Sequence, residues 1–127
     1  MARAQYSVLV VDDSESVRLV VALMLDAQGY LVEVAHNRDE ALQRIQLRNF
    51  DVILIDVNLG HDSGAVLAED LLQDSQNHKI VLTTGLPDLA PEMAHHPCLS
   101  ALPVLYKPFA RQQLMEAVRK AVGLDAA

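Results

Sequence analysis

Residues 51–56, DVILID, form a run of four apolar residues between two aspartates. A short apolar run without polar alternation is typical of a strand that is buried on both faces, as in a parallel sheet covered by helices on its two sides. Parallel strands also need crossover connections that are long enough to hold a helix. This segment therefore favours an α/β chain in which DVILID is the central strand.

The rest of the chain alternates strand-like and helix-like segments, as such a sheet requires. We predict strands over residues 6–11, 31–35, 51–56, 79–84 and 102–107. We predict helices over 17–25, from Asn37 to about 47, over 65–74, at 91–96 and over 109–122. The helix at 91–96 is short because all five prolines lie between positions 87 and 108. Five such repeats predict one parallel sheet covered on both sides, and 127 residues suit a single domain, 1–127.

Composition and charge argue against several classes of protein. The formal net charge is −7 and no cluster of Lys and Arg is present, which argues against a nucleic-acid partner. No run of 18 apolar residues could cross a membrane, and the first residues, MARAQY, leave no room for an export signal, so we expect a cytoplasmic chain. The single cysteine, Cys98, lacks a partner for a disulfide, and we interpret it as a small apolar core residue.

Polar residues follow the predicted strands at their carboxyl ends. In an open parallel sheet these ends gather along one edge and form the ligand crevice. The residues that stand there are Asp12, Asp13, Asp56, Thr83, Thr84 and Lys107. We therefore expect three carboxylates, a hydroxyl and an ammonium to converge on one site.

This set of side chains suits phosphate and a hard cation. Three carboxylates close together raise one another's pKa, so a site that keeps them ionised needs a cation, and Mg²⁺ prefers such oxygen ligands. Asp56 is best placed to attack phosphorus and form an acyl phosphate. Lys107 would neutralise the phosphoryl oxygens, and Thr84 would donate a hydrogen bond to one of them.

Four short motifs stand in order on this pattern: VVDD at 10–13, ILID at 53–56 with Gly64 eight residues on, VLTTG at 81–85 and YKPF at 106–109. They resemble the receiver domain of two-component response regulators over almost the whole chain. The resemblance implies a flavodoxin-like (βα)5 fold, a three-layer sandwich around a parallel five-stranded sheet of order 2-1-3-4-5. It also implies a phospho-accepting signalling domain, which assists its own phosphorylation and dephosphorylation but is not a metabolic enzyme.

The resemblance further assigns the residues of the site. Asp56 would receive a phosphoryl group from a histidine kinase or a histidine phosphotransfer protein. Mg²⁺ would be held by the carboxylates of Asp12, Asp13 and Asp56 and by the backbone carbonyl of Asn58. Lys107 would contact the phosphoryl group, and the peptide bond that follows it, to Pro108, would be cis.

Each of these residues also has an ordinary explanation. Asp13 or Ser14 could simply cap a helix, although a cap needs one side chain and not two acids. Thr83 and Thr84 both favour strands, and alternation puts them on opposite faces, so only one can be the switch hydroxyl. The resemblance selects Thr84. It is the convergence of all these residues on one sheet edge that favours a functional site.

Other functions fit the same fold less well. A Mg²⁺-dependent phosphohydrolase with Asp56 as its nucleophile would be expected to carry a general-acid aspartate two residues later, where Asn58 stands. A flavin or nucleotide module would need glycines in the first strand-to-helix turn, which reads DDSES. A receiver-like module that is never phosphorylated is disfavoured by the complete pocket.

The sequence departs from the usual receiver pattern on the output side. The position three residues before the pocket lysine, usually aromatic, is Val104, and Tyr106 lies two residues later. Gly60 replaces the usual proline four residues after the phospho-acceptor, and we expect it to loosen that loop without affecting the chemistry. We therefore predict an ordinary phosphorylation site that signals to an unknown downstream protein through residues 85–106 in an unusual way, as in a relay or a hybrid-kinase receiver.

Overall fold

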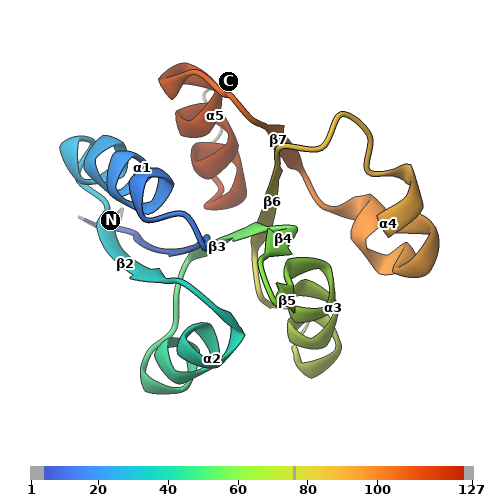
Figure 1. Ribbon diagram of the computed structural model, residues 1–127. Helices are drawn as coiled ribbons and strands as arrows, with labels where there is room; N and C mark the ends of the chain where they lie inside the picture. The colour runs from blue at the N-terminus through green and yellow to red at the C-terminus, as the bar shows by residue number, and fades with distance from the viewer. Residues whose placement is uncertain (1–4, 76, 125–127) are drawn as a thin grey trace.

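The computed structural model describes residues 5–75 and 77–124. Within these ranges, five strands form one parallel sheet in the order β2-β1-β3-β6-β7 (Figure 1). Its strands are β1 (Ser7–Val11), β2 (Leu31–Ala35), β3 (Val52–Asp56), β6 (Ile80–Thr84) and β7 (Val104–Tyr106). Counted along the chain, this is the predicted order 2-1-3-4-5, and the flavodoxin-like fold is confirmed.

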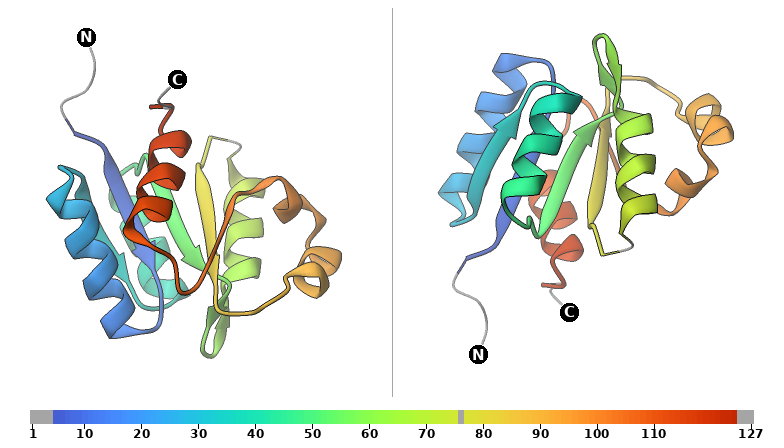
Figure 2. Two further views of the ribbon diagram at one scale, coloured as in Figure 1. Left: turned by 90° about the horizontal axis from the view of Figure 1, so that it is seen from above. Right: turned by 90° about the horizontal axis from the view of Figure 1, so that it is seen from below.

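Helices cover both faces of the sheet, which gives three layers (Figures 1 and 2). One face carries α1 (Glu15–Ala27) and α5 (Arg111–Ala121). The other carries α2 (Arg38–Leu47), α3 (Gly64–Asp74) and the short α4 (Ala90–His95). A 3₁₀ helix, Pro97–Ala101, follows α4. The short fourth helix is confirmed, because the prolines confine it to six residues.

The core consists of one apolar layer on each side of the sheet. Alternation along β1 sends Leu9 and Val11 to the side of α2 and α3, and Val8 and Val10 to the side of α1 and α5. All five residues of β3 are buried, as its continuous apolar run predicts. The sheet is thus fixed on both faces, and this fixes the positions of its strand ends.

Short polar side chains start three of the helices. Ser14 accepts a hydrogen bond from the Val17 N–H, Asn37 from the Glu40 N–H and Ser63 from the Val66 N–H. These contacts satisfy backbone donors that a helix leaves unpaired at its first turn. Ser14 therefore caps α1, and neither Asp12 nor Asp13 is needed for that purpose.

Two expectations from the sequence are wrong. Residues 58–63 are not a loosened loop but a hairpin of β4 (Asn58–Leu59) and β5 (Asp62–Ser63), with Gly60 at its turn and φ +74°. A positive φ at the first of two turn residues suits a glycine, and the strands remain paired on either side. Cys98 is exposed instead of filling the core, and its neighbour Leu99 is the buried residue. None of the helices in the described ranges is long and apolar enough to cross a membrane.

Candidate functional site at the carboxyl ends of the strands

The buried polar side chains in the described ranges all stand at the carboxyl ends of β1, β3 and β6: they are Asp12, Asp56, Thr83 and Thr84. Asp12 directly follows β1, where its N–H donates to the Ala35 carbonyl at 3.1 Å and continues the pairing with β2. Asp56 is the last residue of β3. Burying a carboxylate costs free energy unless the group has hydrogen-bond or charged partners. The contacts of these two acids therefore define the site.

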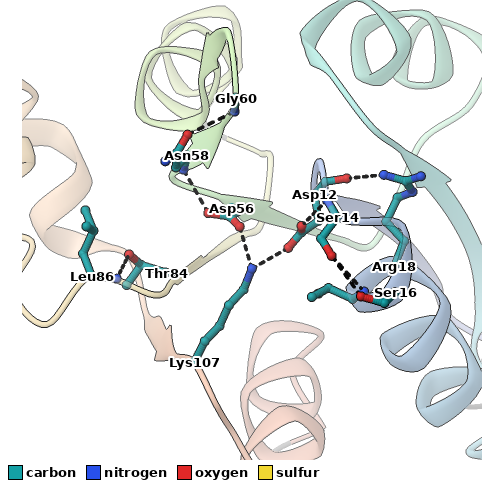
Figure 3. Close-up of polar contacts among 11 residues, drawn as sticks. Asp12, Ser14, Ser16, Arg18, Asp56, Asn58, Gly60, Thr84, Leu86 and Lys107 are labelled. Carbon is teal, nitrogen blue, oxygen red and sulfur yellow. Dashed lines mark hydrogen bonds and ion pairs between the residues drawn. The ribbon is translucent and has the colours of Figure 1, made fainter.

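Lys107 joins the two buried acids. Its Nζ lies 2.8 Å from Asp12 Oδ2 and 2.6 Å from Asp56 Oδ2, so one ammonium bridges the ends of β1 and β3 (Figure 3). The Lys107 N–H donates to the Thr84 carbonyl at 2.7 Å, which places the lysine at the end of β7, and the bond to Pro108 is cis, as predicted. The lysine that follows this apolar strand end thus places its ammonium group beside the two carboxylates.

Backbone donors hold the other oxygens of the two acids. The Ser14 N–H donates to Asp12 Oδ1 and the Asn58 N–H donates to Asp56 Oδ1, both at 2.9 Å (Figure 3). Arg18, on α1, donates from Nη1 to the backbone carbonyl of Asp12 at 2.8 Å. Arg18 is a residue that the sequence reasoning missed, because nothing in its spacing from Asp12 distinguishes it from a solvated helical arginine.

Burial and charge act in opposite directions on the Lys107–Asp56 pair. Burial raises the pKa of the Asp56 carboxyl above its usual value and the Asp12 charge adds to this, while Lys107 and the Asn58 N–H oppose it. Burial lowers the pKa of Lys107, but the hydrogen bonds and charges of Asp12 and Asp56 outweigh it, and the net shift is upward. The ammonium therefore stays charged at neutral pH. Of the two charged groups, the Asp56 carboxylate is the one that its surroundings destabilise.

The three predicted acids form a set of oxygen donors. Asp12, Asp13 and Asp56 can each offer a carboxylate oxygen within 4.8 Å of the others, with Asp13 exposed and the other two buried. Three carboxylates and one ammonium leave two net negative charges, which a divalent cation would balance. Carboxylate oxygens are also the donors that Mg²⁺ prefers, so the donor set fits this ion.

The hairpin that follows Asp56 completes this side of the site. Asn58 Oδ1 accepts from the Gly60 N–H at 3.0 Å, and a Cβ on Gly60 would stand 3.2 Å from Asp13 Oδ2. A Cβ on Gly64 would overlap the backbone oxygen of Asp56. Both glycines therefore permit a close approach of backbone to the acids, and Gly60, which we expected to leave the chemistry untouched, borders the acidic site.

The two threonines of β6 lie on opposite faces of the strand, as alternation predicts. Thr83 lines a small internal cavity together with Asp12 and Phe109, on the side of α1 and α5. Thr84 is buried, and its Oγ1 accepts a hydrogen bond from the Leu86 N–H at 2.9 Å (Figure 3). Among the described residues no hydrogen bond joins either hydroxyl to Asp56, so the switch role of Thr84 stays a prediction.

The register of β6 and β7 places the displaced aromatic residue. Val104 is the Cα partner of Leu82, and Tyr106 is the partner of Thr84. Tyr106 is 49% exposed. The aromatic ring therefore starts directly beside the predicted switch threonine, an arrangement that the sequence did not reveal because it depends on how two distant segments pair.

His36 and His96 each contact a glutamate outside the acidic site. His96 Nδ1 lies 3.1 Å from Glu69 Oε2, which links the segment after α4 to α3. His36 contacts Glu40 through its backbone N–H and its ring. Both rings therefore have protein partners, and none of their hydrogen bonds in the described residues is to Asp12, Asp13 or Asp56.

Known proteins share both the sequence pattern and the fold. The family model of the response regulator receiver domain matches residues 8–119. YkoG of Bacillus subtilis, an uncharacterized transcriptional regulatory protein, is 31% identical over 91% of this chain and 50% of its own length. The CAI-1 autoinducer sensor kinase/phosphatase CqsS of Vibrio cholerae is 33% identical over 60% of this chain and 11% of its own length.

Similarity to a solved structure extends over the whole fold. The chemotaxis protein CheY4 of Vibrio cholerae has a TM-score of 0.83 and 32% identity, and the match covers 93% of this chain and 99% of that protein. The chain spans half or less of the curated relatives named above, but nearly all of this structural neighbour.

Proposed function

Because this chain belongs to the response regulator receiver domain family, we propose that it accepts a phosphoryl group on Asp56 from a histidine kinase or a histidine phosphotransfer protein. The observation that carries this proposal is the Lys107 ammonium between two buried carboxylates, 2.6 Å from Asp56 Oδ2. A buried carboxylate at a strand end beside an ammonium and a set of divalent-cation donors suits phosphoryl transfer more closely than a structural role.

The chemical step uses the carboxylate of Asp56 as the nucleophile. One of its oxygens forms a bond to phosphorus, while the bond from phosphorus to the donor nitrogen breaks and the imidazole leaves with that electron pair. Lys107 already lies beside Oδ2 and would follow the phosphoryl oxygens, which carry more negative charge than the carboxylate. The Asn58 N–H holds Oδ1 and so limits rotation of the carboxyl group.

We assign the metal ligands to Asp12, Asp13, Asp56 and the backbone carbonyl of Asn58. When bound, Mg²⁺ would neutralise charge on the transferring phosphoryl group. Asp12 and Asp56 are oriented by the Ser14 and Asn58 N–H groups, so the two buried donors are positioned by the backbone and not by their own side-chain torsions alone. Asp13 is exposed and free of any capping duty, which suits a ligand that completes the set.

A groove beside Lys107 offers a place for the phosphodonor. It has a volume of about 420 Å³, and α1 lines one side of it and Lys107, Pro108 and Phe109 the other. Leu19 and Leu23 on the same helix are 59% and 62% exposed. We propose that a helix of the donor packs here, because an occupant of this groove would lie next to the residue that contacts Asp56. Val20→Glu would then abolish transfer from a phosphohistidine protein and leave phosphorylation by acetyl phosphate unchanged.

We also propose that residues 1–127 act as one receiver domain in the cytoplasm, as a signalling domain and not as a metabolic enzyme. Its output would pass to another protein through residues 85–106, with Thr84 as the switch. A phosphohydrolase is disfavoured because Asn58, at the position of the missing general acid, is neutral and its side-chain oxygen is engaged by Gly60.

The proposal is tested by intact mass after incubation with Mg²⁺ and acetyl phosphate. Wild type is expected to gain one phosphoryl group, and Asp56→Asn none. Asp51→Asn is the matched control, because Asp51 precedes the same strand at its opposite end and lies outside the site. Equal phosphorylation of wild type and Asp56→Asn would exclude Asp56 as the acceptor.

A further inference from the structure

The β4–β5 hairpin has an attachment outside the acidic site. Asp62, on β5, accepts a hydrogen bond through Oδ2 from the backbone N–H of Arg38 at 3.1 Å. Arg38 is the first residue of α2, 24 positions earlier in the chain. The hairpin, which extends beyond the carboxyl ends of the strands (Figure 2), is thus tied to the start of a helix.

The start of α2 is well suited to hold this carboxylate. Its capping side chain, Asn37, is engaged with the Glu40 N–H at 2.8 Å, so Asp62 supplies an acceptor for a donor that the helix leaves unpaired. A negative charge is also favourable at a helix N-terminus. The Arg38 side chain reaches α3, where Nη2 lies 2.7 Å from Asp70 Oδ2. Arg38 is therefore fixed from two sides.

Pairing within the hairpin connects Asp62 to the acidic site. Asp62 pairs with Leu59, which is 3% exposed, and Ser63 pairs with Asn58. Asn58 in turn contacts Asp56 Oδ1 through its N–H. The turn itself consists of Gly60 and His61, and Gly60 is the residue that borders Asp13. A chain of contacts thus runs from α2 across the hairpin to the predicted metal ligands.

The physical need for this attachment comes from the glycine. Gly60 forms the turn of the hairpin at φ +74°, and a glycine has more conformational freedom to lose on ordering than any other residue type. Any ordering of the hairpin that had to accompany metal binding would weaken that binding. The hydrogen bond from Arg38 to Asp62 involves no predicted metal ligand, so such an anchor would reduce this cost.

We propose, resting on the function proposed above, that Asp62 is a positioning residue for the Mg²⁺ site. By holding the hairpin against α2, it would keep Asn58, whose N–H donates to Asp56 Oδ1, in place next to the acids for metal binding. Asp62 touches neither the ion nor the phosphoryl group, and it acts only through the hairpin.

The experiment measures the Mg²⁺ dissociation constant of the full chain by calorimetry, without a phosphodonor. Asp62→Ala is expected to weaken binding about tenfold, the lower end of the loss seen when groups that support a metal ligand are removed. Asp62→Asn keeps an oxygen acceptor for the Arg38 N–H and is expected to stay within about threefold of wild type. Asp88→Ala is the matched control, because Asp88 also accepts from a helical N–H, that of Ala90 at 2.9 Å, but lies outside the hairpin.

Two results would overturn the positioning role. Asp62→Ala could bind Mg²⁺ as tightly as wild type, or Asp62→Asn could lose as much affinity as Asp62→Ala, which would assign the effect to charge. Failure of wild type to bind Mg²⁺ would instead contradict the metal site of the proposed function. Hydrogen exchange of the Asn58 and Gly60 amides in metal-free protein then decides the inference by itself: faster exchange in Asp62→Ala supports the attachment, and unchanged rates refute it.

Discussion

The acidic pocket and the segment 85–106 both adjoin the carboxyl end of β6, but they are held in different ways. In the pocket, buried carboxylates are tied by Lys107 and by backbone N–H groups. In the segment, α4 has no buried residue and its N-cap, Leu89, makes no side-chain hydrogen bond to the helix. Leu89 and Leu99, on either side of α4, anchor this part of the segment to the core at 3% and 1% exposure.

This difference suits the proposed function, which would combine a rigid site for phosphoryl transfer with a surface that can change conformation. Phosphoryl transfer needs donors and acceptors within a few tenths of an ångström of their working positions, which buried and cross-linked groups provide. A surface that responds to the reaction must be able to open at low cost, which a short helix with few apolar contacts provides. We therefore expect the pocket to be sensitive to substitution and the segment to tolerate it.

The largest contrast is expected between two glycines. A methyl group on Gly64 would overlap the Asp56 backbone oxygen, so Gly64→Ala should cost about 3 kcal/mol of unfolding free energy, because backbone and not a flexible side chain must move. Gly85 has no atom within 4 Å of the same position, and Gly85→Ala should change stability by less than about 0.5 kcal/mol. Urea denaturation of both variants checks this, and similar losses would remove the contrast between the regions.

The next effect is expected at Lys107. Lys107→Met leaves two buried carboxylates without their cationic partner and should destabilise the metal-free protein by about 2 kcal/mol, less than for a fully buried pair because the lysine side chain is 22% exposed. Adding Asp56→Asn should recover part of this loss, because one of the repelling charges is then gone. Lys120→Met, on the exposed side of α5, is the control and should be nearly neutral. A Lys107→Met variant as stable as wild type would mean that the ion pairs do not hold the pocket together.

A smaller effect is expected from the pKa of Asp56. Because burial raises this pKa in the folded protein, the folded state holds its proton more tightly than the unfolded state. The protonated carboxyl therefore contributes stability at pH values below the Asp56 pKa of the unfolded state. This contribution is lost as the pH rises through the Asp56 pKa of the folded state. Asp56→Asn should therefore stabilise metal-free protein at about pH 7.5, and the gain should shrink near pH 4. A gain that is equal at both pH values would contradict the raised pKa.

The smallest effect is expected at Tyr106. Its ring is 49% exposed, so Tyr106→Ala should cost less than about 1 kcal/mol and leave phosphorylation of Asp56 within about twofold of wild type. In wild type, adding Mg²⁺ and beryllium fluoride, a phosphoryl analogue, should shift the NMR signals of residues 85–106. The pattern of these shifts should differ in Tyr106→Ala. If the shifts of wild type stay confined to the pocket, the proposed output through this segment is wrong.

Much of the fold could be predicted because its signals are local. The continuous apolar run of β3 indicated a central strand, and the prolines confined α4 to a few residues. The positions of Asp12, Asp56 and Lys107 at strand ends then followed, since parallel strands present their carboxyl ends at one edge. The stretch 58–63 was interpreted wrongly, because Gly60 suits a loose loop and a tight hairpin turn equally well, and the choice depends on pairing between β4 and β5.

The order of strands and helices along the chain was enough to predict which charged groups meet at the edge of the sheet, because that order places them there whatever the details of packing. How these groups are held could be seen only in three dimensions: in the Lys107 bridge, the pairing of Thr84 with Tyr106 and the hydrogen bond from Arg38 to Asp62. Each of these contacts joins segments that are distant in the chain. Such contacts depend on strand register and helix placement, where a shift of one residue would change every partner.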